Sequence, residues 1–170
     1  MTIPAAATIA TRRLTLVPLR AEDADPLARV LHDERLYEFI GGRPGTVAGL
    51  RDRYAAMAAG SPEPEEVWLN WVVRRRADGQ VLGTVQATIG SRSEGHTADV
   101  AWVIGVDYQN QGYASEAAEA LVDWLRERGA ETVLAHIHPG HHASGRVASR
   151  AGLRATGEYD DEGEQLWRAP

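Results

Sequence analysis

The sequence predicts an α/β (α+β) fold in which a mixed, mostly antiparallel central sheet is flanked by helices. Three strand-like segments, 67–75, 81–89 and 97–106, follow one another with only short turns between them, which predicts an antiparallel meander. Apolar residues at intervals of three and four then predict a helix at 114–128, and a strand follows at 132–138. Because strands and helices do not alternate regularly, this order favours one mixed sheet over repeated β–α–β units.

The other elements can be justified in order along the chain. Residues 13–19 alternate apolar and polar side chains, as a strand with one buried face does. Residues 21–32 and 46–59 show helical spacing of apolar positions, and Gly60 ends the second of these helices. The last elements are a short helix and two strands, at 143–151, 154–159 and 164–168.

Composition excludes several classes of protein. The chain of 170 residues is long enough for one domain with a core, which we expect at 11–169 after a short N-terminal extension at 1–10. All 18 basic residues are arginine, and the chain has no cysteine. The absence of both lysine and cysteine excludes thiolate nucleophiles, disulfides, Cys-ligated metals and mechanisms that need an active-site lysine.

Charge and hydropathy limit the classes of partner that we expect this chain to bind. A net charge of −6 argues against a partner that is a nucleic acid, whose phosphates require a basic face. The apolar stretches are too short to span a membrane, so no membrane partner is expected. The first ten residues have no basic segment followed by an apolar run, so the sequence predicts no signal peptide and a cytoplasmic location.

A glycine-containing loop connects the strand predicted at 97–106 to the helix predicted at 114–128. It reads Gln109-Asn110-Gln111-Gly112-Tyr113-Ala114-Ser115. A helix start offers N–H groups without intrahelical partners and the positive end of the helix dipole, which together suit a phosphate. Gly112 would let the backbone approach such a ligand. The alternative is a glycine needed only for the geometry of the turn.

This loop resembles the acetyl-CoA loop of the GNAT superfamily of N-acetyltransferases, in which Gln/Arg-x-x-Gly-x-Gly/Ala joins a central strand to a helix. A second segment, His138-Pro139-Gly140-His141-His142-Ala143-Ser144 followed by Gly152-Leu153, resembles the strand end and helix that form that superfamily's second landmark. The resemblance covers nearly the whole chain and is closest to the branch with ribosomal-protein-alanine acetyltransferases. It implies the GNAT fold with splayed strands, a single N-acetyltransferase domain, acetyl-CoA as cosubstrate and no metal.

The resemblance also assigns coenzyme-binding roles. Gln109 begins the motif, and the backbone amides that would hold the pyrophosphate are those of Gln111, Gly112, Tyr113, Ala114 and Ser115. The splayed strand end, with Val103, Ile104 and Val106, would pair with pantetheine through backbone groups. An N–H at Val103 or Ile104 would polarise the acetyl carbonyl. His141 stands where many relatives have an asparagine that contacts pantetheine.

Acetyl transfer to an amine needs a neutral amine, support for the tetrahedral oxyanion and a proton for the departing thiolate. Many relatives supply that proton from a tyrosine at the position of Ala148, so the usual acid is missing here. Ser144 is the candidate to hydrogen-bond the sulfur, and a capping or packing role is its alternative. Asp99 is the first candidate base, with a solvated edge-strand carboxylate as the alternative. His138 is the second candidate base.

The function implied is an acetyl-CoA-dependent N-acetyltransferase that acts by direct attack of a primary amine, in a small molecule or at a protein N-terminus. The alternative is a non-catalytic acyl-CoA-binding or sensing domain, which the missing tyrosine leaves open. A third interpretation is a histidine metal site, because His136 and His138 share a strand face. The expected partners are acetyl-CoA and an amine acceptor. The excess of acidic residues favours an acceptor that is a cation. A homodimer and a monomer both remain open.

Overall fold

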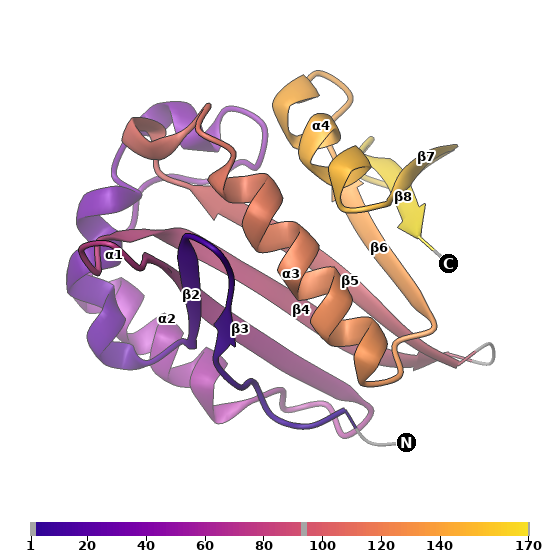
Figure 1. Cartoon of the computed structure of the whole chain (residues 1–170), viewed down its shortest axis with the longest axis horizontal. Coiled ribbons are helices and arrows are strands. Elements are labelled where there is room, and N and C mark those ends of the chain that lie inside the picture. The colour runs from indigo at the N-terminus through magenta and orange to yellow at the C-terminus, as the bar shows by residue number, and fades with distance from the viewer. Residues whose placement is uncertain (1–2, 93–94, 170) are drawn as a thin grey trace.

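The computed structural model describes residues 3–92 and 95–169, and within them eight strands form one sheet in the order β1-β2-β3-β4-β5-β6-β8-β7 (Figure 1). The strands are β1 (Ile9–Ala10), β2 (Leu14–Pro18), β3 (Glu66–Arg75), β4 (Val81–Arg92), β5 (Gly95–Ile104), β6 (Thr132–Ile137), β7 (Arg154–Tyr159) and β8 (Gln165–Ala169). The helices are α1 (Ala24–Val30), α2 (Val47–Ala59), α3 (Tyr113–Glu127) and α4 (His142–Arg150). Three short 3-10 turns are η1 (Ala21–Asp23), η2 (Glu34–Tyr37) and η3 (Val106–Tyr108).

The sheet is mixed, as the sequence predicts. Strands β3, β4 and β5 form the expected antiparallel meander. Strand β6 then runs parallel to β5, and their pairing ends with Asp99 opposite Leu134. Because β5 continues to Ile104 and β6 to Ile137, the two strands separate beyond that pair. The splay that the family resemblance implies is therefore present.

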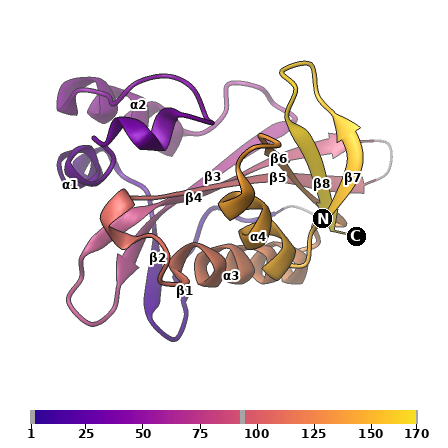
Figure 2. The ribbon, with the colours of Figure 1, turned by 90° about the horizontal axis from the view of Figure 1, so that it is seen from above.

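Helices cover both faces of the sheet. Figure 2 shows α1 and α2 on one side and α3 and α4 on the other. The main core lies under α3, where Leu121 and Leu125 are fully buried and the Trp71 and Trp124 rings meet edge to face with centroids 5.3 Å apart. Each fully buried leucine contributes about 2 kcal/mol to folding through the loss of apolar surface from water.

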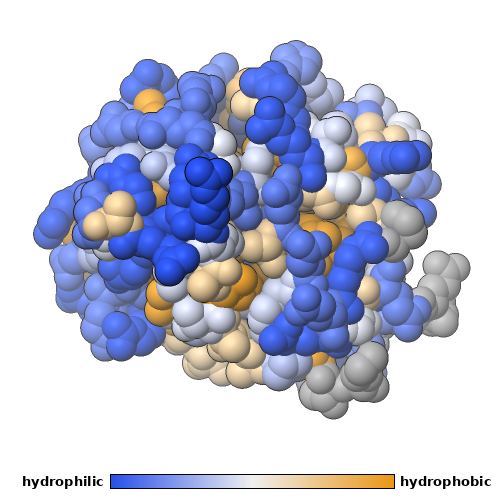
Figure 3. Space-filling view, viewed as in Figure 1, coloured by the Kyte–Doolittle hydropathy of each residue, from blue (hydrophilic) through white to orange (hydrophobic). Residues whose placement is uncertain are grey.

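A second, smaller core lies under α1 and α2, where Leu27, Tyr54 and Val72 pack together. The surface seen in Figure 3 is largely hydrophilic, with apolar patches between the polar side chains. No helix in residues 3–92 or 95–169 is long and apolar enough to cross a membrane.

Two predicted elements differ from those observed. The single helix expected at 21–32 is a 3-10 turn followed by α1, because the buried Asp23 carboxylate accepts from the Arg20 backbone N–H and closes the first turn. The strand expected at 97–106 ends at Ile104, since Gly105 N–H donates to the Leu82 carbonyl and the chain then turns. Val106 therefore lies in η3 and not on the strand.

The segment expected to be an N-terminal extension contributes to the sheet in part. Ile9 and Ala10 pair with β2, and Ile3 is buried. The indole N–H of Trp71 donates to the Ala7 carbonyl at 2.9 Å. A two-residue strand has too few residues to show the alternation by which strands are predicted.

Candidate functional site

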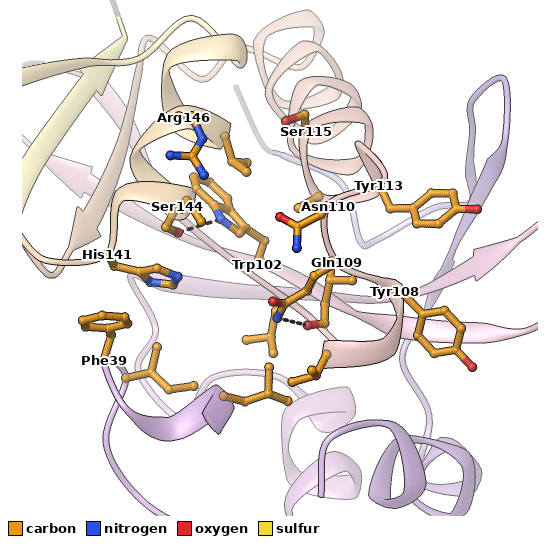
Figure 4. Close-up of a pocket in the computed structure, with 18 of the residues that line it drawn as sticks. Phe39, Trp102, Tyr108, Gln109, Asn110, Tyr113, Ser115, His141, Ser144 and Arg146 are labelled. Atoms are coloured by element: carbon orange, nitrogen blue, oxygen red, sulfur yellow. Dashed lines mark hydrogen bonds between the residues drawn. The ribbon is translucent and has the colours of Figure 1, made fainter. Parts of the chain in front are cut away.

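A cavity of about 560 Å³ lies where the end of β5, the start of α3 and one side of α4 meet (Figure 4). Its volume is within the range of small-molecule sites. The cavity is lined by most of the residues singled out for coenzyme binding, namely Val103, Ile104, Val106, Gln109, Gly112, Tyr113, Ala114, Ser115, His141 and Ser144. Gln111 does not line it but holds the loop in place through its backbone carbonyl.

The loop that leads into α3 contains two residues with positive φ angles. Gly112 caps it with φ 82° and ψ 5°, a left-handed conformation that is adopted most easily by glycine. Asn110, two residues earlier, also has a positive φ of 61°. The N–H groups of the first turn have no intrahelical acceptor, and the helix dipole is positive at this end. This side of the cavity, the α3 wall, therefore has the free donors and the positive helix end that suit an anion.

Arg13 connects the start of α3 to the N-terminal part of the sheet. Its Nη1 donates to the Gln111 carbonyl at 2.9 Å, its Nε donates to Glu116 Oε1 at 2.8 Å, and its guanidinium lies 4.4 Å from the centre of the Tyr113 ring. Burial raises the pKa of Glu116, but hydrogen bonds from Thr11 and Arg13 outweigh that effect and lower it overall. An ionised Glu116 thus keeps a guanidinium beside the loop.

The backbone of Ile104, and not that of Val103, faces the gap between β5 and β6. Backbone groups of successive residues in a strand point to opposite sides. Gly105 N–H donates to β4, and a Cβ placed on Gly83 of β4 would collide with the Val103 carbonyl oxygen. Val103 and Gly105 therefore point to β4, whereas Trp102 and Ile104 point the other way. Gln109 Nε2 donates to the Ile104 carbonyl at 2.9 Å on that side.

Ser144 lies in the first turn of α4, and its Oγ accepts from the indole N–H of Trp102 at 2.9 Å (Figure 4). An indole N–H only donates, so the hydroxyl hydrogen of Ser144 is left to donate elsewhere. Ala148, one turn later, is fully buried in the main core. The α4 residues that line the cavity are instead Ala143, Ser144, Arg146, Val147 and Arg150.

His141 forms the opposite wall with an aromatic partner. Its ring stacks on Phe39, with centroids 4.7 Å apart and planes 15° apart (Figure 4). Burial lowers the pKa of His141, and the nearby His138 lowers it further. His138 lies outside the cavity and lines a second hollow, and its Nδ1 accepts from the Gly140 N–H at 2.9 Å. A neutral His141 has one donor and one acceptor for a ligand.

Asp99 lies outside the cavity and on the inner part of the sheet. Strand β5 has β4 and β6 as neighbours, so the edge-strand alternative for this carboxylate is wrong. Asp99 Oδ1 is 3.3 Å from His136 Nε2, and His136 Nδ1 is 2.9 Å from Asp160 Oδ2. Among the residues whose placement is described, no group of three or more His, Cys, Asp or Glu side chains is arranged to hold a metal ion.

Several cavity residues were not foreseen from the sequence. Arg146 and Arg150 line the cavity from α4, and their spacing of four residues would have put them on one helix face. Trp102 and Phe39 gave no such signal, because their roles depend on contacts with Ser144 and His141 more than 40 residues away.

Known proteins share both the sequence pattern and the fold. Residues 13–154 match the family described as acetyltransferase (GNAT) domain. The uncharacterized N-acetyltransferase YnaD of Bacillus subtilis is 34% identical over 76 residues, which cover 42% of this chain and 45% of that protein, so the match spans less than half of the relative's length.

Two solved structures share the fold along nearly the whole chain. The ribosomal-protein-S5-alanine acetyltransferase from Vibrio fischeri has a TM-score of 0.77 at 18% identity over 96% of both chains. The microcin C7 self-immunity acetyltransferase MccE, solved in complex with acetyl-CoA and AMP, has a TM-score of 0.77 at 13% identity over 94% of this chain and 93% of that one.

Proposed function

Because this chain belongs to the acetyltransferase (GNAT) domain family, we propose that it is an acetyl-CoA-dependent N-acetyltransferase. Its single catalytic domain covers residues 11–169, and the acetyl group passes by direct attack to a primary amine, in a small molecule or at a protein N-terminus. The observation that carries the proposal is the cavity in which the gap between β5 and β6 meets the start of α3. MccE, which shares the fold, was solved with acetyl-CoA bound.

The pyrophosphate of acetyl-CoA is assigned to the α3 wall of the cavity. The first-turn N–H groups of α3 would donate to its oxygens, and the helix dipole favours its charge. Arg146 and Arg150 add positive charge from α4, and the Arg13 guanidinium lies beside Gly112, although its charge is balanced by Glu116. Electrostatic fit of this kind would give a chain with net charge −6 a local site for a polyanion.

The pantetheine arm is assigned to the free side of β5. Backbone groups of Trp102 and Ile104 face the gap, where an extended ligand can pair with them as a strand would. An N–H on this side would donate to the acetyl oxygen when negative charge develops there. His141, with one donor and one acceptor, is placed to contact the arm from the opposite wall.

Ser144 is the proposed proton donor to the departing sulfur. The amine nitrogen forms a bond to the acetyl carbon, the carbon–sulfur bond breaks, and the thiolate takes a proton through the Ser144 hydroxyl. The Trp102 indole supports this role, because it occupies an acceptor position on Oγ and leaves the hydroxyl hydrogen available.

The test begins with coenzyme binding. Calorimetric titration with acetyl-CoA would compare the wild type with Ser115→Asp and Ser115→Asn, at the third residue of α3. A carboxylate there is favourable to the helix start, so the aspartate variant is expected to fold, yet it repels the pyrophosphate. We expect at least a tenfold weaker affinity for Ser115→Asp and little change for Ser115→Asn. No binding by the wild type at millimolar acetyl-CoA would refute the proposal.

A second candidate function is a non-catalytic acyl-CoA-binding or sensing domain. The observation that favours it is that the α4 residues lining the cavity are Ala143, Ser144, Arg146, Val147 and Arg150, with no tyrosine among them. Thiol release would decide between the two, measured with a peptide bearing a free N-terminal alanine, a linear polyamine and an aminoglycoside. Release with any of these, lost in Ser144→Ala, supports the enzyme, whereas binding without release supports the sensor.

A further inference from the structure

A histidine held between two carboxylates lies beside the place where β5 and β6 separate. His136 Nδ1 is 2.9 Å from Asp160 Oδ2, and its Nε2 is 3.3 Å from Asp99 Oδ1. We infer that His136 is the base that removes a proton from the acceptor ammonium before acetyl transfer, with Asp160 holding its ring in orientation. The inference rests on the proposed function and adds a group on β6 to it.

The strand register places His136 next to the reacting end of the gap. Asp99 is opposite Leu134, and directly opposed side chains lie on the same face of a sheet. His136, two residues after Leu134, therefore shares that face and is level with Ala101. At about 3.3 Å per residue, this level is one to three residues, or about 3–10 Å, from the Trp102–Ile104 backbone that faces the gap. This offset is along the strands only, and His136 lines neither of the two cavities, so the amine nitrogen would exchange its proton with Nε2 at the edge of the gap, with ordered water as the bridge where the separation exceeds one hydrogen bond.

The two contacts of the ring suggest which nitrogen is the base. The 2.9 Å contact with Asp160 has the length of a normal hydrogen bond, whereas the 3.3 Å contact with Asp99 is at the long end. A neutral imidazole has one N–H and one lone pair. With the N–H on Nδ1 and donated to Asp160, the lone pair is on Nε2, and it and the Asp99 carboxylate are then two acceptors 3.3 Å apart, an arrangement that a cation placed between them stabilises. An ammonium bound by Asp99 can then give its proton to Nε2.

The charged groups that face this ring come from two other parts of the sheet. Asp99 belongs to β5, and Asp160 and Glu164 belong to the turn between β7 and β8, next to Gln165, which pairs with Ile137 of β6. The N–H of Glu164 lowers the pKa of Asp160, and the hydrogen bond with the ring lowers it further against the opposing effect of burial. Arg168 of β8 has Glu158 as its own partner at 3.9 Å. A largely acidic surround attracts a cationic amine.

The proposed step conserves atoms and charge. The ammonium R–NH3⁺ transfers one proton to His136 Nε2, and the nitrogen lone pair then forms the bond to the acetyl carbon. The carbon–sulfur bond breaks with its electron pair on sulfur, which takes the second proton of the nitrogen through Ser144. The products are the amide, the free thiol and one proton on His136. That proton passes to water, because the His136 side chain is 37% exposed.

The test is a pH series of kcat/KM for the acceptor that supports thiol release, in the wild type, His136→Gln and Asp160→Asn. The control is His96→Gln, near the opposite end of β5 from the cavity. We expect His136→Gln to lower kcat/KM by about 100-fold at pH 7, the scale of general base catalysis. The deficit should shrink as the pH approaches the pKa of the amine, because free amine then forms without a base. Asp160→Asn should show a smaller loss with the same trend, and the control should stay within twofold.

Two further measurements show whether the loss of activity comes from proton transfer. Unchanged acetyl-CoA affinity and unfolding temperature in the variants attribute the loss to proton transfer. A His136→Gln rate within twofold of the wild type at pH 7, or a loss that is the same at every pH, overturns the inference while the proposed function stands. Should His136→Gln not fold, Asp160→Asn decides by the same pH criterion. A wild type that binds no acetyl-CoA removes the proposed function, and this inference with it.

Discussion

Removing the charge of Glu116 should weaken the contacts that hold the start of α3 against the N-terminal part of the sheet. Its carboxylate accepts from the Thr11 hydroxyl, the Arg13 N–H and the Arg13 Nε, so Glu116→Gln weakens three hydrogen bonds and removes one ion pair. Each charged hydrogen bond is worth about 1.5–3 kcal/mol when buried, and far less where a partner is exposed to water. Glu116 is 19% exposed and Arg13 38%, so we expect a net loss of about 2 kcal/mol.

The assay is urea and thermal unfolding of Glu116→Gln beside Glu119→Gln, an exposed glutamate on the same helix. A loss of about 2 kcal/mol corresponds to a Tm lower by about 4–8 °C in a chain of this length. The pKa of Glu116 is lowered by folding, so its contribution is present above its unfolded pKa of about 4.3 and is lost as the pH falls through the folded value. Equal stability of the two variants at pH 7, or a difference unchanged at pH 3, would refute the reasoning.

Two other predictions concern the opposite walls of the cavity. In a double-mutant cycle of Trp102→Phe and Ser144→Ala, the unfolding free energies should couple by about 1 kcal/mol, the net value of one neutral hydrogen bond, and additivity would contradict that bond. Burial lowers the pKa of His141, so wild-type stability should fall as the pH drops below the ordinary histidine value of about 6.5. His141→Asn should reduce that slope in urea unfolding between pH 8 and pH 5, and an unchanged slope would count against the buried neutral ring.

Elements with strong local signals were predicted closely from the sequence. The helix expected at 114–128 is observed at Tyr113–Glu127, because its apolar spacing is regular and a glycine lies at each end. The helix expected at 21–32 was wrong in its first turn. Asp23 is buried there, and its carboxylate contacts Arg74 at 3.2 Å, 51 residues away, a contact that no local pattern contains.

The residues of the candidate site also fall into two groups: those that a local sequence pattern predicts and those whose place depends on distant contacts. The glycine loop motif and Ser144 could be found in the sequence because short segments carry them, and the structure brings them to one cavity. Their roles toward a coenzyme stay predictions. Arg13 and Phe39 could not be found, because Arg13 holds the loop and Phe39 lines the cavity from the N-terminal part of the chain. Asp99 was proposed alone, and its link to His136 depends on the parallel pairing of β5 with β6.

The Arg13–Glu116 ion pair affects the order in which parts of the chain fold during synthesis. Its two residues are 103 positions apart, and Phe39 meets His141 across a similar separation. Contacts of such high sequence separation close late, since the loop entropy must be lost before they stabilise anything. On the ribosome, the contacts of Arg13 and Phe39 must therefore wait until α3 and the segment leading into α4 have emerged. The cavity can therefore form only after α3 and α4 have been made, when strands β2 to β5 have already had time to pair.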